Sequence, residues 1–150
     1  MTRILFVSSQ SSCRNRIAGA VITKLARDLG MEERLQINLA AVGEMSGVLL
    51  DISLQKLLEE RGIERPLETL PLLQNRDYDQ YDLLIGMDRR DLREMYHTCG
   101  GDFSDKMSLL LDRTSHPGDV LELQEVTDLP PVLEQIREGC LGLLEQLQKL

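Results

Sequence analysis

Cysteine is scarce in this sequence, and a long apolar run is missing from it. The three cysteines form an odd number at wide spacings, without a Cys-x-x-Cys pair, which argues against a disulfide framework and against a zinc site. No stretch approaches the roughly 20 apolar residues that a membrane-spanning helix requires. The chain leads directly into a predicted strand, without the apolar segment of a signal peptide, so we expect a cytoplasmic protein that has no membrane partner.

Basic residues are outnumbered, because the chain has 17 Lys and Arg against 25 Asp and Glu and a net charge of -8. A nucleic-acid surface needs basic residues gathered into a patch, and here they are scattered, so we expect no nucleic-acid partner. The same net charge repels anionic ligands at a distance. An anion site in this protein therefore has to be locally positive, and the sequence indicates neither a metal nor another cofactor to make it so.

Strand-like and helix-like patterns alternate along all 150 residues, with no internal repeat and no low-complexity segment. This alternation predicts a single three-layer α/β domain over 1–150, a doubly wound parallel sheet of about four strands flanked by helices. The predicted strands span 4–7, 35–42, 83–87 and 106–111, and the predicted helices span 17–29, 51–61, 77–81, 89–96 and 132–150.

The first of these strands delivers a small polar loop to a helix. Ile4 to Val7 is apolar, Ser8 to Ser12 suits a tight turn, and Gly30 ends the helix that follows. A loop of this kind at a helix N-terminus brings unpaired backbone N–H groups and the positive end of the helix dipole together, which favours an anion. Arg14 can add a planar fork for two phosphate oxygens. The apolar stripe expected on this helix is Ile17, Val21, Leu25 and Leu29.

Three aspartates precede predicted helices and are expected to act as N-caps: Asp51, Asp88 and Asp128. Asp88 also follows a predicted parallel strand, at the end where open α/β sheets bind their ligands. For Asp88 we favour the role of helix N-cap and keep a role in the ligand site as the alternative. The inward face of the last helix is predicted to comprise Leu133, Ile136, Cys140, Leu143, Leu144 and Leu147.

The segment from Val7 to Arg16 resembles the phosphate loop of the low-molecular-weight protein tyrosine phosphatases. In that family a nucleophilic cysteine stands six residues before an arginine. Ser8 and Arg14 hold these two places, and Cys13 matches a second cysteine of the family. Four further segments resemble the family in its own order along the chain: Asp51 to Ile63, Tyr81 to Asp88 with Leu92, Lys106 to Asp112, and Glu134 to Cys140.

The resemblance implies the fold of that family and a phosphate or phosphotyrosine-containing ligand. The phosphate-binding residues that it implies are Ser9, Gln10, Ser11, Ser12, Cys13, Arg14 and Asn15. The sequence also departs from the family in this loop. Ser11 stands where the family has an asparagine, Asn15 where it has Ser or Thr, and Arg16 where it has Pro. In the family, an aromatic residue forms one wall of the substrate cleft. Met45 is the bulky candidate for that place in this chain, whose aromatic residues fall elsewhere.

At the catalytic positions the sequence departs further from the family. Ser8 stands where the nucleophile is expected, and Glu122 falls in the place of the general acid, with Asp119 as its rival, in a predicted loop over 114–127. A serine hydroxyl needs a neighbouring base to become a nucleophile, and the loop offers none. We therefore expect a phosphate- or phosphotyrosine-binding member of the family, a pseudophosphatase that is inactive or very slow.

Two alternatives stay open. The chain could be an active tyrosine phosphatase, working through a cysteinyl phosphate, that carries a Cys-to-Ser change at Ser8. It could also be a thiol redox protein, similar to arsenate reductases on this fold, that uses Cys13 and Cys99. We expect the helix N-terminus and nearby arginines to favour the thiolate of Cys13, while Cys99 is expected in a loop and Cys140 in the core. The oligomeric state is left open.

Overall fold

The computed structural model describes residues 1–9, 12–43, 52–62 and 70–149. Its strands are β1 (Thr2–Ser9), β2 (Leu35–Val42), β3 (Leu83–Gly86) and β4 (Met107–Leu109). Its α-helices are α1 (Arg14–Asp28), α2 (Ile52–Glu60), α3 (Asp77–Gln80), α4 (Arg89–Cys99) and α5 (Leu129–Gln148), with 3₁₀ turns at Glu32–Arg34, Leu110–Arg113 and Val126–Asp128. The predicted cap Asp51, the predicted wall Met45, and the loop residues Gln10 and Ser11 lie outside the described residues.

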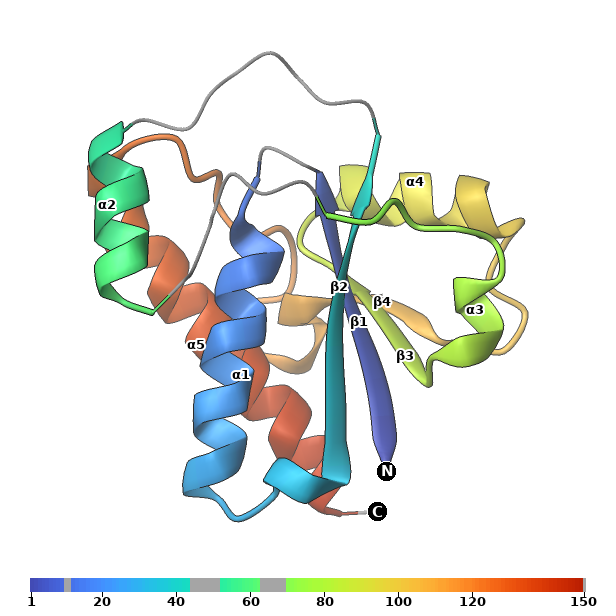
Figure 1. The fold of residues 1–150 in the computed structure, drawn as a ribbon. Coiled ribbons are helices and arrows are strands. Elements are labelled where there is room, and N and C mark those ends of the chain that lie inside the picture. The colour runs from blue at the N-terminus through green and yellow to red at the C-terminus, as the bar shows by residue number, and fades with distance from the viewer. Residues whose placement is uncertain (10–11, 44–51, 63–69, 150) are drawn as a thin grey trace.

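In the described part of the chain, four strands form a parallel sheet in the order β2-β1-β3-β4. The first strand, β1, lies at its centre and pairs with β2 from Thr2↔Leu35 to Ser9↔Val42. On its other side it pairs with β3 from Ile4↔Leu83 to Val7↔Gly86. Parallel strands bring their carboxyl ends to one edge, and α1 and α4 begin at that edge (Figure 1). The predicted α/β class and parallel doubly wound sheet are confirmed.

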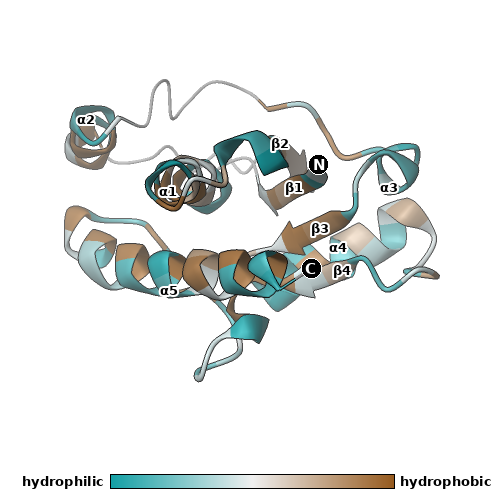
Figure 2. Ribbon diagram, turned by 90° about the horizontal axis from the view of Figure 1, so that it is seen from below, coloured by the Kyte–Doolittle hydropathy of each residue, from teal (hydrophilic) through white to brown (hydrophobic). Residues whose placement is uncertain are grey.

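Alternating residues of β1 enter two cores on opposite faces of the sheet. Ile4 and Phe6 pack with residues of α1, α2 and α5, whereas Leu5 and Val7 pack with residues of α3 and α4. Figure 2 shows α1 and α5 on one side of the strands and α3 and α4 on the other. Because both faces are covered, β1 is apolar over consecutive residues rather than at every second one.

Helix α1 begins at Arg14, three residues earlier than predicted, and presents a different face to the core. The predicted stripe is wrong at its end, because Leu29 is 48% exposed, while Val21 and Leu25 are only partly buried. The buried apolar positions are Ile17, Ala18, Gly19, Ile22 and Ala26. Gly19 lets α1 approach β2 closely, since a Cβ at this position would lie 3.2 Å from Leu39 Cδ2. The larger Val and Leu residues sit at the flanks of this contact.

The C-terminus of α1 is a Schellman motif, as Gly30 predicts. Gly30 adopts φ 70°, and its N–H donates to Arg27 O at 3.1 Å, while Met31 N–H donates to Ala26 O at 2.8 Å. The left-handed conformation costs glycine little, so this residue stops the helix where the chain turns into β2.

The last helix starts earlier than predicted and is not capped by Asp128. Leu129 is its first residue, followed by Pro130 and Pro131, which have no N–H to donate to a capping side chain. The Asp128 carboxylate instead accepts from Gln124 N at 3.0 Å and Glu125 N at 2.9 Å, which closes the preceding 3₁₀ turn. The predicted inward face is confirmed, with Leu133 partly buried at its margin.

The ends of β4 and α4 also differ from the prediction. Strand β4 ends at Leu109, because Leu110–Arg113 turns into a 3₁₀ helix. Helix α4 continues to Cys99, which places that thiol in the core instead of a loop. Within the described ranges, no helix is both long enough and apolar enough to cross a bilayer.

Candidate anion-binding site

A backbone hydrogen bond joins the end of β1 to the residues just before α1. Ser8 and Ser9 end the strand, and Ser12 N–H donates to Ser9 O at 3.1 Å. Cys13 follows in the left-handed conformation, with φ 58° and ψ −5°, and Arg14 opens the helix. The end of the strand and the start of the helix therefore lie together at the carboxyl edge of the sheet, as the sequence predicts.

The N-terminus of α1 carries no negative charge of its own. Cys13 makes no side-chain capping hydrogen bond, and the first turn of the helix contains no acidic residue. Backbone N–H groups at the start of a helix and the helix dipole attract an anion when no capping carboxylate occupies them. This helix start is therefore suited to an external anion.

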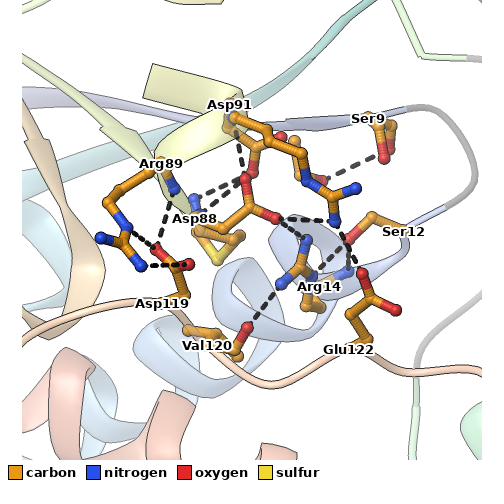
Figure 3. A network of polar contacts seen from close by, with 12 residues as sticks. Ser9, Ser12, Arg14, Asp88, Arg89, Asp91, Asp119, Val120 and Glu122 are labelled. Carbon is orange, nitrogen blue, oxygen red and sulfur yellow. Dashed lines mark hydrogen bonds and ion pairs between the residues drawn. The ribbon is translucent and has the colours of Figure 1, made fainter. Parts of the chain in front are cut away.

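The Arg14 side chain turns inward and is fixed by three short hydrogen bonds. Its side chain is only 4% exposed, and Nε donates to Ser12 Oγ at 2.6 Å. Nη1 donates to Val120 O at 2.7 Å, and Nη2 donates to Asp88 Oδ2 at 2.6 Å (Figure 3). An arginine has five N–H donors, so these bonds leave part of its capacity for a ligand. The guanidinium is held in place before any ligand arrives.

Asp88 both caps α4 and pairs with Arg14. Its Oδ1 accepts from Asp91 N at 2.8 Å, which confirms the predicted cap. Burial alone would raise the Asp88 pKa, but the hydrogen bond from Arg14, the Asp91 N–H and the charges of Arg14 and Arg90 together lower it. Asp88 is therefore an anion inside the site and neutralises Arg14. The sequence places Asp88 at the ligand-binding edge but does not reveal this ion pair.

Asp91 completes the capping box from the other side. Its Oδ2 accepts from Met87 N at 3.1 Å and from Asp88 N at 3.3 Å. Burial, together with the nearby negative charge of Asp88, raises the pKa of Asp91 to about 6. The two carboxyl groups thus have pKa values moved in opposite directions, because the arginine contacts only one of them directly.

The two candidate acids are paired with arginines of α4. Asp119 Oδ1 accepts from Arg89 N at 2.9 Å and from Arg89 Nε at 3.3 Å. Glu122 Oε1 accepts from Arg90 Nη2 at 2.7 Å, and its Oε2 accepts from Gln124 Nε2 at 3.1 Å. These contacts fasten the segment after 118 to the start of α4. Sequence reasoning missed both arginines, although their position directly after Asp88 was a usable signal.

Ser8 is completely buried, and the hydrogen bond that the structure gives its Oγ runs to Ser9 O at 3.5 Å. Asn15 is also buried, and its Nδ2 donates to Phe6 O at 3.3 Å and to Ala40 O at 3.0 Å. The Asn15 side chain therefore ties α1 to β1 and β2. A contact between Asn15 and an anion would have to use its backbone N–H.

The cysteines do not form a redox pair. Burial raises the pKa of Cys13, and the charge of Arg16 opposes this only in part, so the expectation of a favoured thiolate is wrong. Cys13 belongs to the core under α1 and α5, whereas Cys99 belongs to the core on the opposite face of the sheet. Burial also raises the pKa of Cys99 and of Cys140, and the predicted core position of Cys140 is confirmed.

Comparisons with known proteins agree on one family. A family model described as low molecular weight phosphotyrosine protein phosphatase matches residues 3–150. The low molecular weight protein-tyrosine-phosphatase YfkJ of Bacillus subtilis is 26% identical over 99% of this chain and 97% of its own length.

Solved structures share the fold. The crystal structure of YfkJ superposes with a TM-score of 0.82 at 25% identity, covering 99% of this chain and 96% of YfkJ. A protein tyrosine phosphatase from Entamoeba histolytica with Hepes in its active site gives 0.82 at 18% identity, over 99% of this chain and 98% of that one. The YwlE arginine phosphatase, as a Cys-to-Ser mutant with a phosphorylated active-site serine, superposes with a TM-score of 0.75 at 21% identity. The match covers 99% of this chain and 97% of that one. With the family match covering nearly its whole length, this chain belongs to the low molecular weight phosphotyrosine protein phosphatase family.

Proposed function

We propose that this chain binds phosphate or a phosphotyrosine-containing ligand at the loop from Ser8 to Arg14, and that it is inactive or very slow as a phosphatase. The observation that carries the proposal is the buried Arg14 guanidinium, fixed beside a helix start that has no acid of its own. The contacts proposed for the ligand are the backbone N–H groups of the loop and the remaining Arg14 donors. The residues concerned are Ser9, Gln10, Ser11, Ser12, Cys13, Arg14 and Asn15.

The chemistry of Ser8 supports slow turnover. Phosphomonoester cleavage through a covalent intermediate needs a nucleophile, donors around the phosphoryl oxygens and an acid for the leaving group. We place Ser8 at the nucleophile position. A serine hydroxyl requires a base to take its proton, and the partner that the structure gives the Ser8 hydroxyl is a carbonyl. Without a base, attack by this hydroxyl is slow.

The acid position supports the same conclusion. We place Glu122 at the position of the general acid, with Asp119 as the alternative. Each carboxylate accepts hydrogen bonds from an arginine of α4, Glu122 from Arg90 and Asp119 from Arg89. A carboxylate that is bound to an arginine has to release it before it can reach a leaving group.

The serine of the YwlE mutant indicates what very slow chemistry would leave behind. That active-site serine carries a phosphoryl group. In this chain, the corresponding step would form a bond between Ser8 Oγ and phosphorus and break the bond to the leaving oxygen, which takes up a proton. A serine phosphate is a stable ester, so Ser8 would retain the phosphoryl group.

Calorimetric titration with inorganic phosphate tests binding, and hydrolysis of an aryl phosphate tests turnover. We expect the wild-type protein to bind phosphate, Arg14→Ala to lose that binding, and the wild type to release at most one equivalent of phenol per protein above the buffer rate. Ser8→Cys introduces a thiol at the position proposed for the nucleophile and should raise hydrolysis. Failure of the wild type to bind phosphate would refute the binding role, and multiple-turnover hydrolysis by the wild type that disappears in Ser8→Ala would refute the inactivity.

A further inference from the structure

Arg90 brings a second guanidinium to the proposed site from a different element. It lies in the first turn of α4, two residues after Asp88, which caps the helix. Its Nη2 is 3.7 Å from Asp88 Oδ2, the same oxygen that accepts from Arg14 Nη2 at 2.6 Å. Two guanidinium groups therefore share one carboxylate oxygen, although their residues are far apart in the sequence.

The two arginines differ in how firmly they are held. The Arg14 side chain is 4% exposed and pairs with a buried carboxylate, whereas the Arg90 side chain is 72% exposed and pairs with Glu122, which is 56% exposed. An exposed ion pair contributes little to stability, but breaking a buried one is costly. Glu122 is thus the partner that an incoming anion can displace, and Asp88 is the partner that stays.

The charge balance of the site favours a further cation beside Arg14. Asp88 neutralises Arg14, and the chain as a whole has a net charge of -8. A phosphate dianion that approached Arg14 alone would meet the negative charges of Asp88 and Glu122 with a single cation to offset them. Arg90 already faces both carboxylates, so it can turn its donors to a dianion without leaving the site.

We propose that Arg90 is a second ligand-binding arginine, which contacts the phosphoryl oxygens of a phosphate or phosphomonoester dianion, and that Glu122 is its counter-ion when no ligand is bound. The inference rests on the proposed function, since it concerns the same ligand. It gives Glu122 a use that does not depend on catalysis. The ligand class that follows is the dianionic phosphoryl group, in preference to a singly charged anion.

Titration calorimetry with inorganic phosphate at about pH 8, where phosphate is mainly a dianion, tests this assignment. Arg90→Ala should weaken binding on the order of 10-fold, which is the effect of losing one charge-assisted hydrogen bond. Arg93→Ala is the matched control, because Arg93 is an exposed arginine on the same helix, and it should bind as the wild type does. Glu122→Gln removes the competing charge and should bind phosphate more tightly than the wild type.

The outcomes separate the two proposals. If Arg14→Ala loses phosphate while Arg90→Ala binds as tightly as the wild type, the assignment of Arg90 is wrong and the proposed function stands. Equal weakening by Arg90→Ala and Arg93→Ala would also overturn it, since that effect reports general charge. Weaker binding by Glu122→Gln would refute the role of Glu122 as a competing counter-ion. Absence of phosphate binding in the wild type would remove both proposals together.

Discussion

The substitution Asp91→Asn should remove a pH dependence from the stability of this protein. Asp91 is buried in the capping box at the start of α4, where its carboxylate accepts two backbone N–H groups and faces the negative Asp88. These surroundings raise the pKa of Asp91 from an ordinary 3.8 to about 6. An asparagine has nearly the same shape and can still accept a backbone hydrogen bond, but it does not titrate.

The sign and the size follow from linkage. Between about pH 4 and pH 6 the folded protein binds the Asp91 proton more tightly than the unfolded chain does, so stability falls as pH rises through this window. The difference of about 2 pKa units corresponds to about 3 kcal/mol at about 1.4 kcal/mol per unit. Asp88 acts in the opposite sense and at lower pH, because its pKa is lowered in the folded protein. Its ionised carboxylate stabilises the fold at pH values above the ordinary pKa of an aspartate, and this contribution is lost as pH falls.

Urea unfolding of the wild type and of Asp91→Asn at about pH 4, 5, 6 and 7 measures this contribution as the difference between their free energies of unfolding. We expect Asp91→Asn to gain up to about 3 kcal/mol relative to the wild type across the window. Substitution of the exposed Asp28 by asparagine is the control and should leave the pH profile unchanged. A difference between wild type and Asp91→Asn that stays constant over the window would refute the assignment of this titration to Asp91.

Three further predictions follow from the packing and the ion pairs. Asp88→Asn leaves Arg14 buried without its counter-charge and should lower the free energy of unfolding by about 3–5 kcal/mol in chemical denaturation; an effect below about 1 kcal/mol would contradict the buried pair. Inorganic phosphate should raise the Tm of Asp88→Asn more than that of the wild type in thermal melts, because the ligand supplies the missing negative charge, and an equal rise would count against it. Gly139→Ala should destabilise the protein by about 1–3 kcal/mol in urea unfolding, since the new Cβ would lie 2.5 Å from Leu110 Cγ; unchanged or increased stability would show that α5 does not pack this closely.

Local patterns in the sequence predicted the frame of this fold well. The bounds of β2 were predicted without error, because alternation at 35–39 and a small apolar run at 40–42 leave little choice of element. Gly30 marked the end of α1, since its left-handed conformation is a local preference. The core stripe of α1 was harder to predict, because two adjacent stripes have the same spacing. Only the sheet and α5 decide that Ala18 and Ala26 face inward.

The contacts that fix the site could be predicted only in part. The loop from Ser8 to Arg14 and the cap Asp88 are local features, and each was found in the sequence. The bond between Arg14 and Asp88 joins residues 74 positions apart, and it depends on the order of the strands. The pairing of Arg89 with Asp119 and of Arg90 with Glu122 likewise depends on where the segment before α5 crosses the start of α4. The spacing of these residues along the sequence does not predict where the two segments cross.

A crystal structure with inorganic phosphate tests the central claim most directly. The account predicts a phosphate ion at the end of β1, over Ser8 Oγ, with its oxygens accepting from Arg14 and from backbone N–H groups at the start of α1. Phosphate bound elsewhere, or an Arg14 guanidinium that keeps all its donors on Ser12, Asp88 and Val120 while the loop stays empty at saturating phosphate, would contradict it.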